Sequence, residues 1–369
     1  MKITLIGNSD LVLYNFRKEL ISSLINNNHE VIIICPNGKK VNLLISLGAK
    51  HINWSVNRHS KNPFIEIYSL YALNNILKKL NSDFVLSFTI KPNIYSGILS
   101  RFYKFKHIPN ITGLGQVFSR KNLTRFLIII LYKISFKFSK IIFLQNSSDL
   151  NLFKSLKIYT NKLQLLPGSG VNIDEFSYTE YPSDQKGIKF LYLGRIMKEK
   201  GFDLYTEAAK IIKSGQKNIE FIVCGFPEKG YESILNKAIN EGIIHFKGNL
   251  IDIRPIIKLC HCLIQPSFYP EGISNVVLEA SSMGRPVITS DNVGCGELVI
   301  DNKSGLIFEK KNLTDLVFKI NKFINLSFEN KLELGLNSRE IMVKNYNRSI
   351  IVLTYLNIIE GRNQLARLS

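Results

Sequence analysis

Strand-length apolar runs alternate with helix-length amphipathic segments along almost the whole chain, and this alternation restricts the possible folds more than any other feature. It is typical of parallel β-sheets whose strands are joined by helical crossovers. We predict strands at residues 3–6, 31–35, 84–88, 108–112, 141–144, 163–166, 188–193, 220–224, 243–246, 263–265 and 287–289. We predict helices at residues 14–25, 64–80, 93–103, 202–213, 231–240, 327–346 and 348–360. The predicted fold class is therefore α/β.

The alternation is interrupted near the middle of the chain. Leu166-Pro167-Gly168-Ser169-Gly170 has the composition of a turn, and the polar stretch 178–187 shows neither a helix nor a strand period. A length of 369 residues also suits two domains of ordinary size. We therefore expect two Rossmann-like domains, 1–168 and 169–346, which face each other across a cleft, and a last helix at about 347–369 that packs back on the first domain.

The positive charge of the chain is concentrated in its first half. Residues 1–175 contain 23 Lys and Arg against 8 Asp and Glu, a net charge of +15, which leaves only +4 of the total of +19 for the rest. Such an asymmetry indicates an anionic partner, either a nucleic acid or the cytoplasmic face of a membrane. A Lys-rich surface without a partner is the alternative, because Lys outnumbers Arg 36 to 12.

Cysteine usage and hydropathy indicate a cytoplasmic protein. The five cysteines are scattered and odd in number, and the start, Met1-Lys2-Ile3-Thr4-Leu5, has the composition of a strand rather than a signal peptide. No apolar run approaches the ~20 residues that span a bilayer. Cys260-His261-Cys262 lacks the second ligand pair of a metal site, and its apolar surroundings, residues 256–264, indicate a buried strand.

The first candidate site element is the segment from Gly194 to Gly201, between a predicted strand and a predicted helix. Ligands of open α/β sheets bind beyond the carboxyl ends of the strands, where this segment lies. Gly194 and Gly201 allow tight turns, and Arg195 and Lys200 carry charges that neutralise a diphosphate. Solvated surface charge is the alternative interpretation.

The second element, residues 270–280, also lies between a strand and a helix. Ser274 or Asn275 is a natural N-cap, so the free N–H groups of the first turn favour an anion there. Glu271 precedes the helix and Glu279 lies in its second turn, and carboxylates accept hydrogen bonds from sugar or ribose hydroxyls. The alternative interpretation is that neither glutamate binds a ligand, and that Glu271 is a charged loop residue and Glu279 a charged residue on the helix surface.

Together these two elements resemble family 4 of the retaining glycosyltransferases, which have the GT-B architecture. The motif is a glutamate, seven residues and a second glutamate, here Glu271 and Glu279, with Gly194-Arg195 and Lys200-Gly201 upstream. The resemblance implies that Arg195 and Lys200 hold the diphosphate of a nucleotide-sugar donor. It also implies that Glu279 binds the ribose and Glu271 the transferred sugar. The backbone N–H groups of Gly272, Ile273 and Ser274 would face the sugar and the distal phosphate.

The first half is similar to bacterial surface-glycan members, including the N-acetylgalactosaminyltransferases of lipid-linked oligosaccharide assembly. The likeness is carried by Tyr14-Asn15-Phe16-Arg17, Asn62-Pro63-Phe64, Gly113-Leu114-Gly115 and the run from Leu131 to Phe138. Many relatives have a donor-contacting histidine in this half, and none is found at residues 112–118. Lys91, or the turn with Gly113 and Gly115, is our candidate for that neighbourhood.

The resemblance implies transfer of a hexose or N-acetylhexosamine, from UDP in our interpretation, to a polyprenyl-diphosphate-linked glycan in O-antigen or capsule synthesis. It also implies that catalysis depends on Arg195, Lys200 and Glu271, with front-face attack and retention of the anomeric configuration. Metal-dependent transferases use an Asp-x-Asp pair, which this sequence lacks, so we expect neither a metal nor another cofactor. No enzymic nucleophile is assigned.

Residues 120–140 alternate Leu, Ile and Phe with basic residues, among them Arg120, Lys121, Arg125, Lys133 and Lys137. This pattern is typical of a basic helix at a membrane interface. The alternative is a crossover helix with one buried face. Together with the positive charge of the first domain, the basic and apolar pattern of residues 120–140 favours peripheral binding to the anionic inner face of the plasma membrane.

Two other functions fit part of the sequence. A GT-B-like nucleotide-sugar epimerase needs the same donor cleft but no lipid acceptor. A basic nucleic-acid-binding module is less favoured, because no nucleic-acid motif is visible and Glu271 and Glu279 would share its cleft. We therefore expect no nucleic-acid partner.

Overall fold

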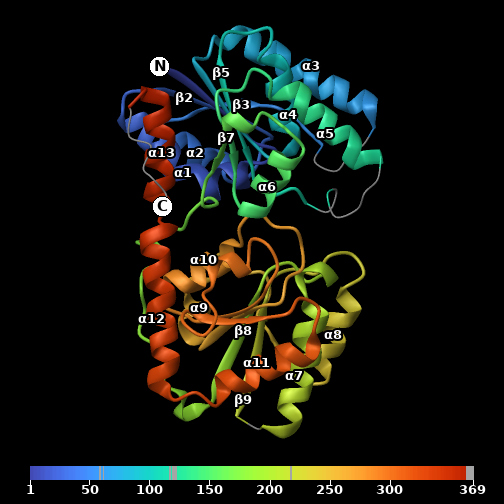
Figure 1. The fold of residues 1–369 in the computed structure, drawn as a ribbon, viewed down its shortest axis with the longest axis vertical. Helices are drawn as coiled ribbons and strands as arrows, with labels where there is room; N and C mark the ends of the chain where they lie inside the picture. The colour runs from blue at the N-terminus through green and yellow to red at the C-terminus, as the bar shows by residue number, and fades with distance from the viewer. Residues whose placement is uncertain (58–59, 61, 116–117, 119–122, 217, 363–369) are drawn as a thin grey trace. The chain divides into compact units, whose positions relative to one another are not determined.

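The computed structural model describes residues 1–57, 60, 62–115, 118, 123–216 and 218–362. The chain divides into two compact units (Figure 1). Unit 1 is Met1–Gly170 with Arg348–Ser369, and unit 2 is Val171–Asn347. The last seven residues of the predicted closing segment, 363–369, lie outside the described part of the chain.

Unit 1 is a parallel sheet with helices on both faces. Its strands are β1 (Lys2–Ile6), β2 (Glu30–Cys35), β3 (Lys50–Asn53), β4 (Phe84–Phe88), β5 (Lys106–Ile111), β6 (Ile142–Leu144) and β7 (Leu163–Leu165). Its helices are α1 (Asp10–Asn26), α2 (Val41–Ser46), α3 (Pro63–Leu80), α4 (Ile90–Leu99), α5 (Leu123–Ser135), α6 (Ser147–Ser155) and α13 (Arg348–Glu360). The strand order is β3-β2-β1-β4-β5-β6-β7, with Ile6 in register with both Ile34 and Ser87.

Two apolar clusters cover the two faces of this sheet. One joins α1, α2 and α13 to the sheet through residues such as Leu20, Leu44 and Tyr355. The other joins α3, α4 and α5 to the opposite face through Leu73, Tyr95 and other residues. Because the strands are buried on both faces, they appear in the sequence as continuous apolar runs.

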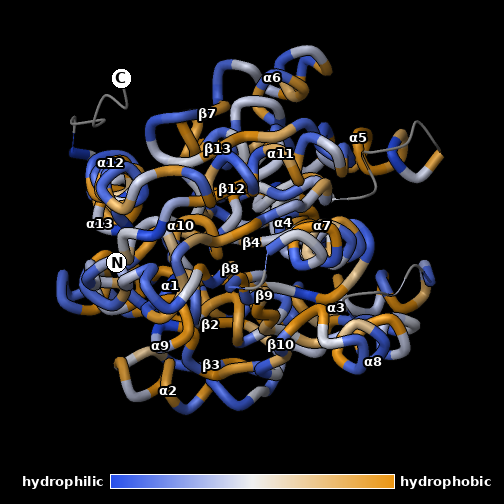
Figure 2. Tube along the Cα trace, turned by 90° about the horizontal axis from the view of Figure 1, so that it is seen from below, coloured by the Kyte–Doolittle hydropathy of each residue, from blue (hydrophilic) through white to orange (hydrophobic). Residues whose placement is uncertain are grey.

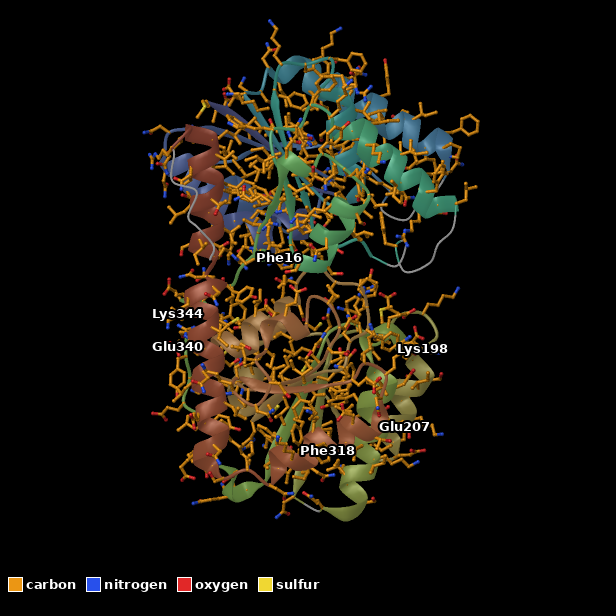
Figure 3. The ribbon with its side chains drawn as sticks, viewed as in Figure 1. Phe16, Lys198, Glu207, Phe318, Glu340 and Lys344 are labelled. Atoms are coloured by element: carbon orange, nitrogen blue, oxygen red, sulfur yellow. The ribbon has the colours of Figure 1, made fainter. Side chains whose placement is uncertain are left out.

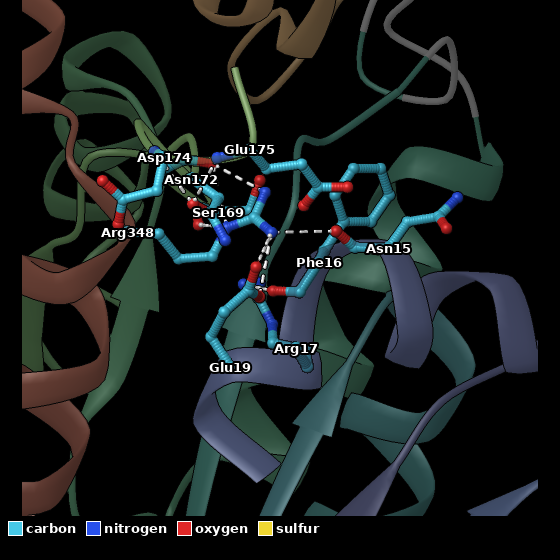
Figure 4. Close-up of polar contacts among 10 residues, drawn as sticks. Asn15, Phe16, Arg17, Glu19, Ser169, Asn172, Asp174, Glu175 and Arg348 are labelled. Atoms are coloured by element: carbon cyan, nitrogen blue, oxygen red, sulfur yellow. Dashed lines mark hydrogen bonds and ion pairs between the residues drawn. The ribbon is translucent and has the colours of Figure 1, made fainter. Parts of the chain in front are cut away.

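Arg348 attaches the returning helix α13 to the rest of unit 1 (Figure 4). Its guanidinium donates to both carboxylate oxygens of Glu19 at 2.9 Å and to the carbonyl oxygen of Asn15 at 3.1 Å, both on α1. It also donates to the carbonyl oxygens of Ser169 and Gly170. This buried cation is therefore satisfied by a bidentate carboxylate and by backbone oxygens, the partners that a buried guanidinium needs.

Unit 2 is a second parallel sheet with helical crossovers. Its strands are β8 (Ile188–Leu193), β9 (Ile219–Cys224), β10 (His245–Phe246), β11 (Cys262–Gln265), β12 (Val287–Ser290) and β13 (Gly305–Phe308). Its helices are α7 (Phe202–Gly215), α8 (Glu232–Asn240), α9 (Arg254–Leu259), α10 (Asn275–Ser282), α11 (Leu313–Ile324) and α12 (Phe328–Asn345). The order is β10-β9-β8-β11-β12-β13, which reverses between β8 and β11. Figure 3 shows the side chains of both units. Glu340 and Lys344, four residues apart on α12, form an ion pair.

The predicted α/β class with two Rossmann-like sheets is confirmed, and three local predictions need correction. The strands β3 and β13 were not predicted, because Lys50–Asn53 is a polar edge strand and Gly305–Phe308 is only four residues long. Residues 256–264 do not form one strand: Arg254–Leu259 is helical, and the strand begins at Cys262. Helix α4 begins at Ile90 rather than at residue 93, with Pro92 in its first turn, a position that tolerates proline.

The five cysteines are free and buried. His261, between two of them, accepts a hydrogen bond at Nδ1 from the backbone N–H of Lys189 at 3.0 Å. Burial lowers the pKa of His261 to about 4. Among the described residues, no helix combines the length and the apolar character that crossing a membrane requires.

Candidate functional site

The two predicted site elements of unit 2 meet where the order of its strands reverses. One follows β8 and begins at Gly194, and the other follows β11 and leads into α10. Since β8 and β11 are parallel neighbours, their carboxyl ends meet at the same edge of the sheet. Such a reversal point is where open α/β sheets bind ligands. The topology therefore brings together segments more than 60 residues apart.

Close backbone contact fixes the two loops against each other. Gly201 has a φ of +75°, and a Cβ there would lie 2.1 Å from the carbonyl oxygen of Pro266, so no other residue fits. The N–H of Phe268 donates to the carbonyl oxygen of Glu199 at 2.8 Å. The two loops are thus one structural unit in front of the sheet.

Lys200 and Glu271 form an ion pair across these loops. The distance from Lys200 Nζ to Glu271 Oε1 is 2.6 Å, and the side chains are only 15% and 13% exposed. Ser267 Oγ donates to the same carboxylate oxygen at 3.0 Å. The structure therefore brings two of the predicted catalytic residues into direct contact and holds the carboxylate with a second donor.

Arg195 has a carboxylate partner of its own. Arg195 Nη1 lies 3.0 Å from Glu228 Oε1, in the loop after β9, and both side chains are more than one third exposed. Burial alone would lower the pKa of Arg195, but the hydrogen bond to Glu228 and the nearby Tyr269 raise it above its ordinary value. The guanidinium therefore stays charged, and the Tyr192 hydroxyl fixes its backbone by donating to the Arg195 carbonyl oxygen at 2.7 Å.

Tyr269 connects the two cations. Its ring centroid lies 5.3 Å from the guanidinium carbon of Arg195 and 5.4 Å from Lys200 Nζ, both within the range of cation–π attraction. Asn292 lies just after β12, and its side chain donates to the Tyr269 carbonyl oxygen at 2.7 Å. This hydrogen bond fixes the position of Tyr269. Two positive groups therefore lie on one aromatic ring.

The backbone before α10 is only partly as predicted. Ser274 occupies the N-cap position, but its hydroxyl makes no capping hydrogen bond. The N–H of Ser274 donates to the carbonyl oxygen of Gly294 at 2.7 Å, so this amide is engaged within the protein. Gly294 has a φ of +78°, and a Cβ there would lie 2.5 Å from the carbonyl oxygen of Gly272. Gly272 and Ile273 are buried, and Glu279 is partly buried on α10.

The candidates Lys91, Gly113 and Gly115 lie in unit 1. Lys91 Nζ contacts Glu66 Oε1 at 2.7 Å and also donates to the carbonyl oxygens of Asn57 and Ser60. Lys91 is thus paired within unit 1, where it holds the loop that contains Asn57 and Ser60. Its place near the donor sugar stays a prediction. Gly113 and Gly115 follow β5 and both have positive φ, +117° and +64°.

The described basic residues of the predicted interfacial segment lie on or just after α5. Arg125 stacks on the ring of Phe118, with 5.7 Å between the guanidinium carbon and the ring centroid, while Lys133 and Lys137 are exposed. Arg120 and Lys121 lie outside the described residues. Five apolar side chains of α5 are exposed: Leu123, Phe126, Leu127, Ile130 and Ile134. The apolar face of this helix is therefore only partly used in the core.

One histidine of unit 1, His107 on β5, lies in its interior. It is buried between the hydroxyls of Ser87 and Ser139, 2.8 and 2.9 Å from its two ring nitrogens. Burial lowers its pKa to about 3, so the ring is neutral at pH 7. His107 therefore belongs to the internal polar network of the sheet.

Two residues of the site, Glu228 and Tyr269, were not identified from the sequence. Glu228 lies four residues beyond β9, at the same edge of the sheet as Gly194, so the rule that ligands bind beyond strand ends could have found it. Tyr269 stands two residues before Glu271, but an aromatic residue in a loop is no signal by itself.

Two family profiles match this chain. The family described as Glycosyl transferases group 1 matches residues 175–345, and the family described as Glycosyl transferase 4-like matches residues 2–146. The first contains the candidate site residues of unit 2, and the second covers most of unit 1.

Among proteins of known activity, the chain is 28% identical over 98% of both sequences to a Campylobacter jejuni enzyme. That enzyme is N,N'-diacetylbacillosaminyl-diphospho-undecaprenol alpha-1,3-N-acetylgalactosaminyltransferase. The chain is 25% identical, over 76% of both sequences, to UDP-Gal:alpha-D-GlcNAc-diphosphoundecaprenol alpha-1,3-galactosyltransferase of Escherichia coli. Among solved structures, HepE of Anabaena in complex with UDP and glucose is similar with a TM-score of 0.80, at 14% identity over 98% of this chain and all of the other.

Proposed function

Because this chain belongs to the retaining glycosyltransferases of family 4, with the GT-B fold, we propose that it transfers a sugar from UDP to a polyprenyl-diphosphate-linked glycan. The similar C. jejuni and E. coli enzymes act on undecaprenyl-diphosphate-linked substrates, which supports this acceptor class. The product would be part of a surface polysaccharide such as O-antigen or capsule, and the sugar a hexose or N-acetylhexosamine.

The observation that carries the proposal is the pair of cations at the strand reversal of unit 2. Arg195 and Lys200 lie on one aromatic ring, and each is held by a carboxylate. A diphosphate is the ligand that two adjacent cations neutralise best, and guanidinium binds phosphate oxygens with two hydrogen bonds. In the proposed complex the donor diphosphate displaces the Glu228 carboxylate and binds the Arg195 guanidinium in its place.

Cleavage of the bond between sugar and phosphate leaves negative charge on UDP and positive charge on the sugar ring. Fixed positive groups beside the leaving diphosphate lower this barrier most, because they need no rearrangement during the reaction. Arg195 and Lys200 supply these groups, Glu271 accepts hydrogen bonds from hydroxyls of the transferred sugar, and Glu279 accepts them from the ribose. The acceptor hydroxyl attacks from the side of the departing phosphate, which takes its proton, and the configuration is retained.

We further propose that the two cations take the role that a divalent ion has in transferases with an Asp-x-Asp pair, a pair that this sequence lacks. Turnover should then be unchanged by excess EDTA. Loss of turnover with EDTA and its recovery with Mg²⁺ or Mn²⁺ would contradict this part of the proposal.

The acceptor is borne by a lipid, so the enzyme must work at a membrane surface. We propose that α5 and the residues after it attach the protein to the inner face of the plasma membrane. The exposed apolar residues of α5 and the exposed Lys133 and Lys137 support this assignment, since an interfacial helix combines apolar insertion with attraction to anionic lipid.

The test is a transfer assay with the purified full chain. A panel of UDP-, GDP- and dTDP-sugars is first screened by thermal shift, because a bound donor stabilises the folded state. The best donor is then incubated with synthetic polyprenyl-diphosphate saccharides. We expect stabilisation by UDP-sugars and an elongated glycolipid. Release of a free epimer without transfer would favour the epimerase alternative, and the absence of any nucleotide-sugar binding would refute the proposal.

A further inference from the structure

Helix α3 of unit 1 exposes a stripe of large apolar side chains that the transfer reaction does not explain. Phe64, Ile67, Tyr68 and Tyr71 are 80%, 64%, 70% and 62% exposed. Their spacing of three and four residues places them on one face of the helix. Single exposed apolar residues are common, but a contiguous group of four indicates a binding surface. We call these four residues the α3 stripe.

The orientation of α3 is fixed by its other face. Ser69, Leu73 and Leu77 are buried against the sheet. The Ser69 carbonyl oxygen accepts a hydrogen bond from the indole N–H of Trp54 at 3.0 Å, and Trp54 is itself buried. A rotation that hid the stripe would expose these residues and break this bond. The helix is therefore apolar on both sides, and the second side has no partner within the described residues of unit 1.

The unpaired charges of α3 are positive. Glu66 is the only acidic residue of α3, and it turns away from the stripe, toward α4. There its carboxylate binds Lys91 Nζ at 2.7 Å and accepts a hydrogen bond from the Tyr95 hydroxyl. The last turn of α3 carries the exposed Lys78 and Lys79. On α3 the negative charge is thus neutralised, while positive charge stays exposed at the end of the helix.

The stripe belongs to the same helical layer as α5. Both helices pack against α4, and all three cover one face of the sheet (Figure 1). Hydrophobic residues are distributed along both α3 and α5 (Figure 2). Helix α5 has no acidic residue, and its exposed apolar side chains also point away from the sheet. Exposed apolar residues within a basic layer are therefore a shared property of α3 and α5.

We propose that the α3 stripe is a second lipid-binding surface, which inserts its aromatic side chains among the headgroups of an anionic bilayer. This inference rests on the proposed function only in that the acceptor is membrane-borne. Tyrosine rings combine an apolar body with a polar hydroxyl and are enriched at the membrane interface, where both groups are satisfied. Exposed lysines on the same helix add attraction to anionic lipid.

Two attachment helices on one rigid layer bind more strongly than either alone, because the second contact forms within a complex that already exists. They also restrict the rotation of unit 1 on the bilayer, since a single helix leaves the protein free to turn about the helix axis. The α3 stripe would therefore orient unit 1 as well as strengthen its attachment.

The experiment measures sedimentation of the full chain with phosphatidylcholine vesicles, with and without phosphatidylglycerol. The test variant replaces Phe64, Tyr68 and Tyr71 with serine. The control replaces three exposed apolar residues of unit 2, Leu259, Phe318 and Leu336, with serine. Phe318 on α11 is labelled in Figure 3. We expect the test variant to lose about tenfold or more in affinity for phosphatidylglycerol vesicles, and the control to bind as the wild type does.

A second readout shows where the stripe lies. Tyr68→Trp should be quenched by brominated lipid in phosphatidylglycerol vesicles, whereas Phe318→Trp should not. Wild-type vesicle binding in the test variant, with no quenching at position 68, would overturn the inference. The inference would also be overturned if the wild type formed a dimer that does not bind vesicles and the test variant were a monomer. The stripe would then join two copies of this chain.

Nucleotide-sugar thermal shift, measured in parallel, separates this inference from the proposed function. If the wild type binds vesicles through the stripe but binds no nucleotide sugar, the proposed glycosyltransferase function is refuted and the α3 stripe is supported as a lipid-binding surface. A variant that keeps full donor stabilisation but no longer sediments supports both.

Discussion

Units 1 and 2 have the same strand order around the point of reversal, but the loops at that point carry different chemistry. In unit 2 the loops after β8 and β11 contain Arg195, Lys200 and Glu271. In unit 1 the loops after β1 and β4 begin with Gly7-Asn8-Ser9 and with Thr89, all uncharged. The Rossmann topology therefore provides the same reversal point twice, and only the second one carries the charged side chains on which the proposed diphosphate site depends.

The charged groups nearest to these loops in unit 1, Asp10 and Lys91, lie on helices and have partners within the unit. The carboxylate of Asp10 accepts a hydrogen bond from the N–H of Lys40 at 2.8 Å, and Lys91 is paired with Glu66. In unit 2, by comparison, the pairs Arg195–Glu228 and Lys200–Glu271 join loops at the carboxyl ends of the strands. Under the proposed function, charge holds loops in unit 1 and presents a diphosphate-binding surface in unit 2.

The largest effect should come from removing the two cations of unit 2. Arg195→Ala combined with Lys200→Ala is expected to lower turnover by about 10³-fold or more, because both groups stabilise charge that develops on the leaving diphosphate. Lys210→Ala with Lys237→Ala removes the same charge from exposed helix positions and should leave turnover unchanged. Steady-state kinetics on both variants, with thermal unfolding as a check of the fold, gives the answer. Near-normal turnover of the first variant would remove the diphosphate assignment.

The next effect concerns the contact that joins the two loops of unit 2. Gly201→Ala forces a Cβ to within 2.1 Å of the Pro266 carbonyl oxygen, in a left-handed conformation. We expect about 3 kcal/mol of lost stability and a loss of donor binding, since the loops must separate. Gly215→Ala is the control, because nothing lies within 4 Å of its new Cβ. Equal denaturant midpoints for the two variants would show that the loops are not tightly coupled.

A buried neutral histidine in each unit predicts the dependence of stability on pH. Burial lowers the pKa of His107 to about 3 and that of His261 to about 4, below the ordinary 6.5 of the unfolded chain. The unfolded state therefore takes up protons first, so stability is complete above pH 6.5 and is lost as the pH falls toward the folded-state values. Each histidine should remove about 2 kcal/mol between pH 7 and pH 5.

Chemical denaturation at the two pH values measures this loss. In His107→Gln the loss should be smaller, while in His245→Gln, at an exposed position, it should match the wild type. An unchanged pH dependence in His107→Gln would mean that this ring is not the group that titrates.

The smallest effect concerns the carboxylate on Arg195. Glu228→Gln removes the charge that competes with a diphosphate, and we expect the donor KM to fall roughly threefold with kcat little changed. The effect is small because both partners are more than one third exposed. Glu241→Gln, which alters the exposed pair with Lys237, is the control. A raised KM in Glu228→Gln would instead mean that Glu228 positions Arg195 for the donor.

The sequence predicted most of this architecture because continuous apolar runs report strands that are buried on both faces. It failed where this signal is weak, at the polar edge strand β3 and the short strand β13. The residues of the candidate site could be named from motifs, but their partners could not. Lys200 and Glu271 are 71 residues apart, and their contact depends on the neighbouring positions of β8 and β11. No local pattern encodes the ring of Tyr269 beneath both cations.

The return of α13 to unit 1 also has a consequence for how the protein is made. Ile351, Tyr355 and Ile359 complete a cluster with α1, yet the ribosome adds them only after all of unit 2 has been synthesised. Unit 2 is continuous in sequence and can reach its native state while the nascent chain is still growing. Unit 1 can complete its apolar cluster beside α1 only after these last residues have been added, so its folding must finish after that of unit 2 can begin.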